Sequence, residues 1–163
     1  EPLGMTNSFF AAELTEAQRS NFAVGYGPNK KRLAEDYMRY PELAASGMYT
    51  TVQDYARFVQ AMLNAIQGTD DRFLDQKLAR EVLLPAKNEE TMLVNRNDTK
   101  FFWGGATKGF YTQFEADAVD HRWVVVAFMN DHINWSFNGA LRGKGIEYAK
   151  AQMAAANSSE NHE

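Results

Sequence analysis

The chain contains no cysteine among its 163 residues, and no apolar run in it is long enough to cross a membrane. The missing cysteine excludes disulfides and thiolate zinc sites, and it fits either the cytoplasm or the cell envelope. Basic residues are not in excess: the net charge is −4 and the two signs are interspersed. We therefore expect neither a nucleic-acid surface nor a membrane span.

What is present is an ordinary globular composition, with 45% hydrophobic and 23% charged residues, enough for one modest domain. The first residue is Glu1 and not methionine, which favours a piece of a longer protein. Glycine and proline interrupt the first 50 residues repeatedly, so we expect mostly loop there, with a short helix over residues 11–19.

Two helices are expected in the next part of the chain. Thr51 and Asp54 have the spacing of a capping box, and Gly68 is a plausible stop for the helix that they begin. Behind the cap, apolar residues recur at helical spacing and should form one buried stripe: Val52, Tyr55, Val59, Met62, Leu63 and Ile66. A second helix is expected over residues 75–84, and a weak strand over residues 92–94.

The pattern changes to strands at Phe101. Residues 101–103 should lead into a glycine-rich bend over 104–109, and residues 110–116 should form an alternating strand. The apolar run 123–129 is typical of a central strand buried on both faces. A last helix should follow, and its candidate core positions are Leu141, Ile146, Tyr148, Ala149 and Met153.

These elements predict an α+β fold, with antiparallel strands, a helical segment and a packed C-terminal helix. Residues 1–155 would form one unit, made of a loop and helical region (1–100), a strand hairpin (101–130) and a C-terminal helix (133–155). Residues 156–163 would be a disordered tail. Because a two-stranded hairpin is too small a sheet to stand alone, more chain or a second copy should complete it.

Four segments, in this order, resemble the β-lactamase and penicillin-binding protein superfamily, especially its class C and esterase-like branches. Residues 2–8 resemble its PLGM-x-x-T/S segment, and residues 45–58 its AGGLYSTAxDLARF segment. Residues 103–112 resemble H-x-G-G-T-P-G-F-S-S, and residues 124–130 match the strand that ends in VVVLxN. The resemblance covers nearly the whole chain, and it implies the C-terminal part of a partial β-lactamase/transpeptidase-like fold.

The resemblance also implies the site residues. Trp103, Gly104 and Gly105 stand where the family has its Lys/His-Thr/Ser/Gly-Gly motif, on a strand that lines the catalytic cleft. Gly105 would allow close approach of the substrate, and the backbone N–H of Ala106 would contribute to an oxyanion hole. Trp103, Gly104 and Phe110 would contact the substrate. Tryptophan supplies an apolar wall without a cation, which favours a neutral or hydrophobic ester. The alternative is a simple bend or bulge with Trp103 in the core.

The family's catalytic motifs are missing from the chain. Its chemistry needs a serine with lysine three residues on, and a Tyr-x-Asn to relay the proton. None of the serines has lysine at that position, and no tyrosine is followed two residues later by asparagine; the serines are Ser8, Ser20, Ser46, Ser136, Ser158 and Ser159. The histidines His121, His132 and His162 have no metal-site spacing. We expect no metal and no cofactor.

Two functions remain open. The chain is either the C-terminal segment of a serine hydrolase acting through an acyl-enzyme on an ester or amide, inactive alone, or a non-catalytic binding or structural module from that family. The expected partners are the missing N-terminal part of the fold, or a second copy in a dimer or swap, and a small ester or amide substrate. The resemblance favours a periplasmic or secreted location, with the cytoplasm as the alternative.

Overall fold

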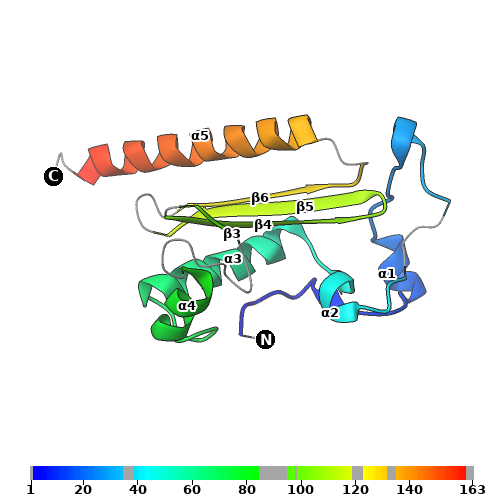
Figure 1. The fold of residues 1–163 in the computed structure, drawn as a ribbon, viewed down its shortest axis with the longest axis horizontal. Helices are drawn as coiled ribbons and strands as arrows, with labels where there is room; N and C mark the ends of the chain where they lie inside the picture. The colour runs from blue at the N-terminus through cyan, green and yellow to red at the C-terminus, as the bar shows by residue number, and fades with distance from the viewer. Residues whose placement is uncertain are drawn as a thin grey trace.

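The computed structural model describes residues 2–34, 39–84, 95–97, 99–118, 123–131 and 135–160. Four antiparallel strands form a sheet in the order β3-β4-β5-β6, with α3 and α4 on one face and α5 on the other (Figure 1). The elements are β1 (Phe9–Phe10), α1 (Glu16–Ser20), the 3-10 helix η1 (Pro28–Lys30), α2 (Leu43–Ser46), β2 (Met48–Tyr49), α3 (Val52–Gln67), α4 (Gln76–Leu83), β3 (Asn95–Asn97), β4 (Lys100–Thr107), β5 (Phe110–Asp117), β6 (Val124–Met129) and α5 (Trp135–Glu160). The α+β prediction is confirmed.

No helix in the described part of the chain has the length and apolar character needed to span a membrane.

Local chemistry fixes both ends of α3, as predicted. The Thr51 hydroxyl accepts a hydrogen bond from the N–H of Asp54, and Gly68 ends the helix in the left-handed conformation with φ 72°. The predicted stripe packs against the sheet in the core, except that Val52 is 40% exposed. Val52 is the first helical residue and lies outside the packed stripe, so its assignment to the core is wrong.

The neighbouring helices are shorter than the sequence suggests. α4 begins after Asp75, whose carboxylate accepts from the N–H of Leu78. α1 begins only at Glu16, behind a capping box made by Thr15 and Gln18, and not at residue 11. The strand expected over 92–94 lies outside the described residues.

β4 is straight where a glycine-rich bend was expected. It runs through Gly104 and Gly105 to Thr107 with an unbroken register against β5, so the prediction of a bend over 104–109 is wrong. The chain turns only at Lys108 and Gly109. Gly109 has φ +83°, and a Cβ atom there would lie 2.5 Å from Leu33 Cδ1. The turn therefore requires glycine at this one position.

β6 is the last strand in the order, not a central one. Its side chains are mostly half-buried, because α3 contacts one face of the strand and α5 the other. Two covered faces account for the continuous apolar run. The predicted central position is therefore not seen in the described residues, where no further strand pairs with the outer edge of β6.

α5 continues to Glu160, five residues past its predicted end and into the predicted tail. Among its candidate core positions, Leu141 and Tyr148 are 42% and 68% exposed, so their assignment to the core is wrong. The sheet face under α5 carries polar side chains and meets α5 through an ion pair between Arg142 and buried Glu115 (3.2 Å). Gly145 packs on Val125. Because this contact is partly polar, the packed side of α5 is not marked by a stripe of apolar residues in the sequence.

Candidate functional site

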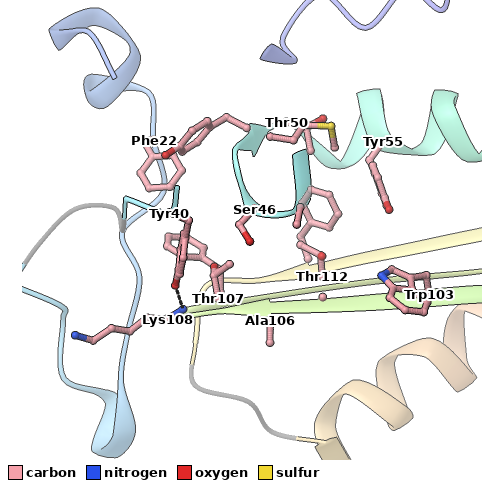
Figure 2. A pocket seen from close by; sticks show the side chains of 16 residues that line it. Phe22, Tyr40, Ser46, Thr50, Tyr55, Trp103, Ala106, Thr107, Lys108 and Thr112 are labelled. Atoms are coloured by element: carbon pink, nitrogen blue, oxygen red, sulfur yellow. Dashed lines mark hydrogen bonds between the residues drawn. The ribbon is translucent and has the colours of Figure 1, made fainter. Parts of the chain in front are cut away.

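A cleft of about 350 Å³ lies along the exposed edge of β4 (Figure 2). Four of the five residues that the sequence proposed for the site line it: Trp103, Gly105, Ala106 and Phe110. Gly104 does not line the cleft; it faces the opposite side of the sheet from its neighbours Trp103 and Gly105. It lies beside Tyr111 on the other face, where an added Cβ would be 3.0 Å from the Tyr111 hydroxyl.

Thr107, Lys108, Thr112 and Phe128 add to the wall made by the sheet. The other walls come from segments far away in the sequence, which supply Phe22, Tyr40, Ala45, Ser46, Met48, Tyr49, Thr50 and Tyr55. The Tyr40 hydroxyl accepts a hydrogen bond from the backbone N–H of Lys108 (3.3 Å), which ties one wall to the β4–β5 turn. The cleft therefore forms only when these separate segments are assembled around β4.

Trp103 stands on the cleft face of β4 and is 49% exposed. Its strand pairing with Phe114 is regular. The alternative in which a bend places Trp103 in the core requires a buried ring and a broken register, and the structure has neither. A half-exposed indole in a cleft is an apolar contact surface with one N–H donor.

The backbone N–H of Ala106 points sideways from the edge of the sheet, away from β5. The turn between Thr107 and Phe110 holds two residues, so these two form a hydrogen-bonded pair. Such pairs alternate along antiparallel strands, and the next pair, Ala106 with Tyr111, therefore directs its N–H and C=O groups away from the partner strand. β3 covers β4 only from residue 100 to residue 102. Among the described strands none lies beside Ala106 on this side, so its N–H faces the cleft edge.

The cleft lining contains a single charged residue among those described, Lys108. Figure 2 shows its side chain directed away from Trp103 and Ala106, and it is solvent-exposed. A ligand beside Trp103 thus meets aromatic rings, hydroxyls and backbone groups.

Asp54 is a buried carboxylate behind the cleft that sequence reasoning treated only as half of a capping box. It accepts hydrogen bonds from the backbone N–H of Asn7 (2.7 Å) and the hydroxyl of Ser8 (2.9 Å), and it pairs with Arg57. The Ser8 hydroxyl also lies 2.7 Å from that of Thr50, which lines the cleft. The N-terminal segment is thus fixed to the start of α3 through one carboxylate.

Opposing effects act on the pKa of Asp54. Burial favours the protonated form and raises the pKa. The hydrogen bonds from Asn7 and Ser8 and the guanidinium of Arg57 favour the carboxylate and outweigh burial, so the pKa lies below its ordinary value of 3.8. Asp54 therefore remains ionised down to low pH and acts as a structural anion.

Asn130 directly follows β6 and fixes a loop next to the β4–β5 turn. Its side-chain amide donates to the carbonyl of Val24 (2.9 Å), and its own carbonyl accepts from the N–H of Tyr26 (3.0 Å). The loop held in this way brings Gly25 against Gly109 and the ring of Phe110. The asparagine of the sequence segment 124–130 thus has a definite structural task that its pattern alone did not reveal.

No group of three potential metal ligands occurs within the part of the chain that the structure describes. His121, His132 and His162, which the sequence assigned to no metal site, lie outside the described residues. The cleft itself offers carbonyls, hydroxyls and aromatic rings, which is a surface for an organic ligand.

No protein family and no curated protein matches the sequence. Solved structures do match the fold. One is a class C beta-lactamase with a TM-score of 0.61 and 16% identity, and another is a class C beta-lactamase in complex with cefoxitin, with a TM-score of 0.62 and 17% identity. Each match covers 90% of this chain but only 48% and 50% of the respective solved chain. The predicted fold resemblance is confirmed: the chain has a fold similar to that of these class C beta-lactamases, and it spans about half the length of these structures.

Proposed function

We propose that this chain forms one wall of the acyl-enzyme site of a serine hydrolase and supplies one oxyanion-hole donor, the N–H of Ala106. The observation that carries the proposal is the outward-facing N–H of Ala106 in a cleft beside Trp103. An oxyanion hole needs such a preorganised donor, and one donor contributes about 3 kcal/mol to transition-state stabilisation. Gly105, which has no side chain to fill the cleft face beside it, would let the substrate approach the strand.

The substrate class follows from what lines the cleft. β-Lactams and D-Ala-D-Ala peptides carry a carboxylate, and the corresponding family motif places a cationic side chain where Trp103 stands. Here the indole gives an apolar surface, and the amine of Lys108 is directed elsewhere (Figure 2). A neutral ester or amide fits this surface best. Phe110 and Trp103 would hold its apolar groups.

The nucleophile and its base would come from residues outside this chain. No serine here has a lysine three residues on. We therefore expect the isolated chain to be inactive and to give no adduct with a fluorophosphonate probe, measured as unchanged intact mass. A covalent adduct on any of its own residues would contradict the proposal. If the chain bound esters but its complete gene product never turned them over, the non-catalytic binding module would be the better description.

The open edge of β6 is where we propose that the rest of the fold adds a strand. β5 directs the N–H groups of residues 111, 113 and 115 toward β6, so Val125, Ala127 and Met129 are the hydrogen-bonded partners. The N–H groups of Val126 and Phe128 then point outward. Exposed apolar edges of this kind pair readily with another chain.

Amide hydrogen exchange of the isolated chain tests this edge. The amides of Val126 and Phe128 should exchange much faster than those of Val125 and Ala127, because only the second pair is bonded to β5. Binding of the missing part should remove the alternation. Equal protection of all four amides in a protein that light scattering shows to be a monomer would contradict an open edge, whereas equal protection in a dimer would identify a second copy as the occupant.

A further inference from the structure

A second cavity, of about 160 Å³, lies between α3, α4 and the sheet. All its lining residues are apolar or aromatic: Tyr55, Phe58, Met62, Phe73, Leu74, Leu83, Trp103 and Phe114. Phe58 and Phe73 meet edge to face with ring centroids 5.3 Å apart, and Tyr55 meets Phe114 in the same way at 5.9 Å. The lining is therefore built of packed rings, with no charged group among the described residues.

This apolar pocket adjoins the cleft. Trp103 and Tyr55 line both spaces, and Figure 2 shows the two rings at the same end of the cleft. A ligand held at Ala106 could thus extend past the indole of Trp103 into the pocket.

Tyr55 lines both spaces, and its hydroxyl is directed toward the side of the cleft where Trp103 lies (Figure 2). Burial raises the pKa of Tyr55, so the hydroxyl remains a neutral donor over the physiological range. No hydrogen bond joins this hydroxyl to another residue that the structure describes. It can therefore donate to an oxygen of a ligand that passes between the two spaces.

We propose that the apolar pocket binds an unbranched alkyl group of the substrate, with the Tyr55 hydroxyl donating to a substrate oxygen at its entrance. This rests on the proposed function, and it narrows the substrate to neutral esters or amides with a flexible hydrocarbon tail. A charged or strongly polar group would lose its hydration in this lining without compensation. Each methylene that enters the pocket should tighten binding about fourfold, until the pocket is full.

Binding to the chain as it stands tests the pocket without any turnover. Methyl acetate, methyl butyrate and methyl hexanoate are titrated into protein with ¹³C-labelled methionine methyl groups. Met62 lines the apolar pocket and Met48 lines the cleft, so their methyl signals report the two spaces separately. The affinity should rise along the series, and the Met62 signal should shift most with the longest ester. A constant affinity, or a shift at Met48 alone, would overturn the proposal.

A pair of variants provides the control. Leu74→Trp should fill the pocket and abolish the dependence on chain length. Leu78→Trp introduces the same ring on α4, at an exposed position outside the pocket. This variant should leave the dependence of affinity on chain length unchanged. If Leu74→Trp fails to fold, as thermal unfolding would show, the ester series on the wild type still decides. Absence of the length dependence refutes the pocket and leaves the proposed function standing, whereas a failure of catalysis in the complete protein leaves the pocket measurement valid.

Discussion

Replacing Ala106 with proline in the complete protein should lower kcat for ester hydrolysis by about 10²- to 10³-fold, with little change in KM. Proline removes the backbone N–H that we propose as an oxyanion donor. Because this N–H points away from β5, its loss breaks no hydrogen bond of the β4–β5 ladder, and proline is tolerated at such edge positions. The measurement is steady-state hydrolysis of a p-nitrophenyl ester by wild type and variant.

Ala106→Gly is the matched control, since it alters the same position but keeps the N–H. It should retain nearly all of the activity. Thermal unfolding of the two variants should differ little, which separates a catalytic loss from a folding defect. Full activity in Ala106→Pro, with the fold intact, would show that the oxyanion is stabilised elsewhere.

Replacing Asp54 with alanine should cause a large loss of stability. The variant leaves the Asn7 N–H, the Ser8 hydroxyl and Arg57 without their shared acceptor. We expect the melting temperature to fall by about 5–10 °C at pH 7. Asp71→Asn is the control, because it removes one negative charge from an exposed position. It should shift the melting temperature by less than about 2 °C.

The acid dependence of this effect has a definite sign. The pKa of Asp54 is lowered by folding, so its contribution to stability is present above the ordinary value of 3.8 and is lost as the pH falls through the lower folded value. The difference in melting temperature between wild type and Asp54→Asn should therefore shrink below about pH 4. A difference that stayed constant from pH 7 to pH 3 would show that the charge of Asp54 does not matter.

The parts of the fold that the sequence predicted are those set by local chemistry. The cap at Thr51, the stop at Gly68 and the buried stripe of α3 each depend on neighbours within a few turns of the same helix. β6 is the last of the described strands although its sequence predicts a central one, because helices cover both of its faces and favour the same apolar run. Leu141 and Tyr148 were misassigned because α5 meets a polar sheet face, so its apolar residues do not mark its packed side.

Only those residues of the candidate site that form a continuous motif in the sequence could be predicted. Trp103, Gly105 and Ala106 follow one another on β4, and their resemblance to a known strand was visible in the sequence. Tyr40 and Thr50 reach the cleft from segments more than 50 residues away and carry no local signal. Asp54 had a signal, the cap spacing, but its contacts with Asn7 and Ser8 depend on how two remote segments meet.

Covalent labelling of the complete gene product with a fluorophosphonate, followed by peptide mapping, tests the central claim most directly. We predict one adduct, on a serine outside these 163 residues that has lysine three positions later, and none on the isolated chain. An adduct on a residue of this chain, or no adduct on a complete protein that hydrolyses esters, would contradict the account.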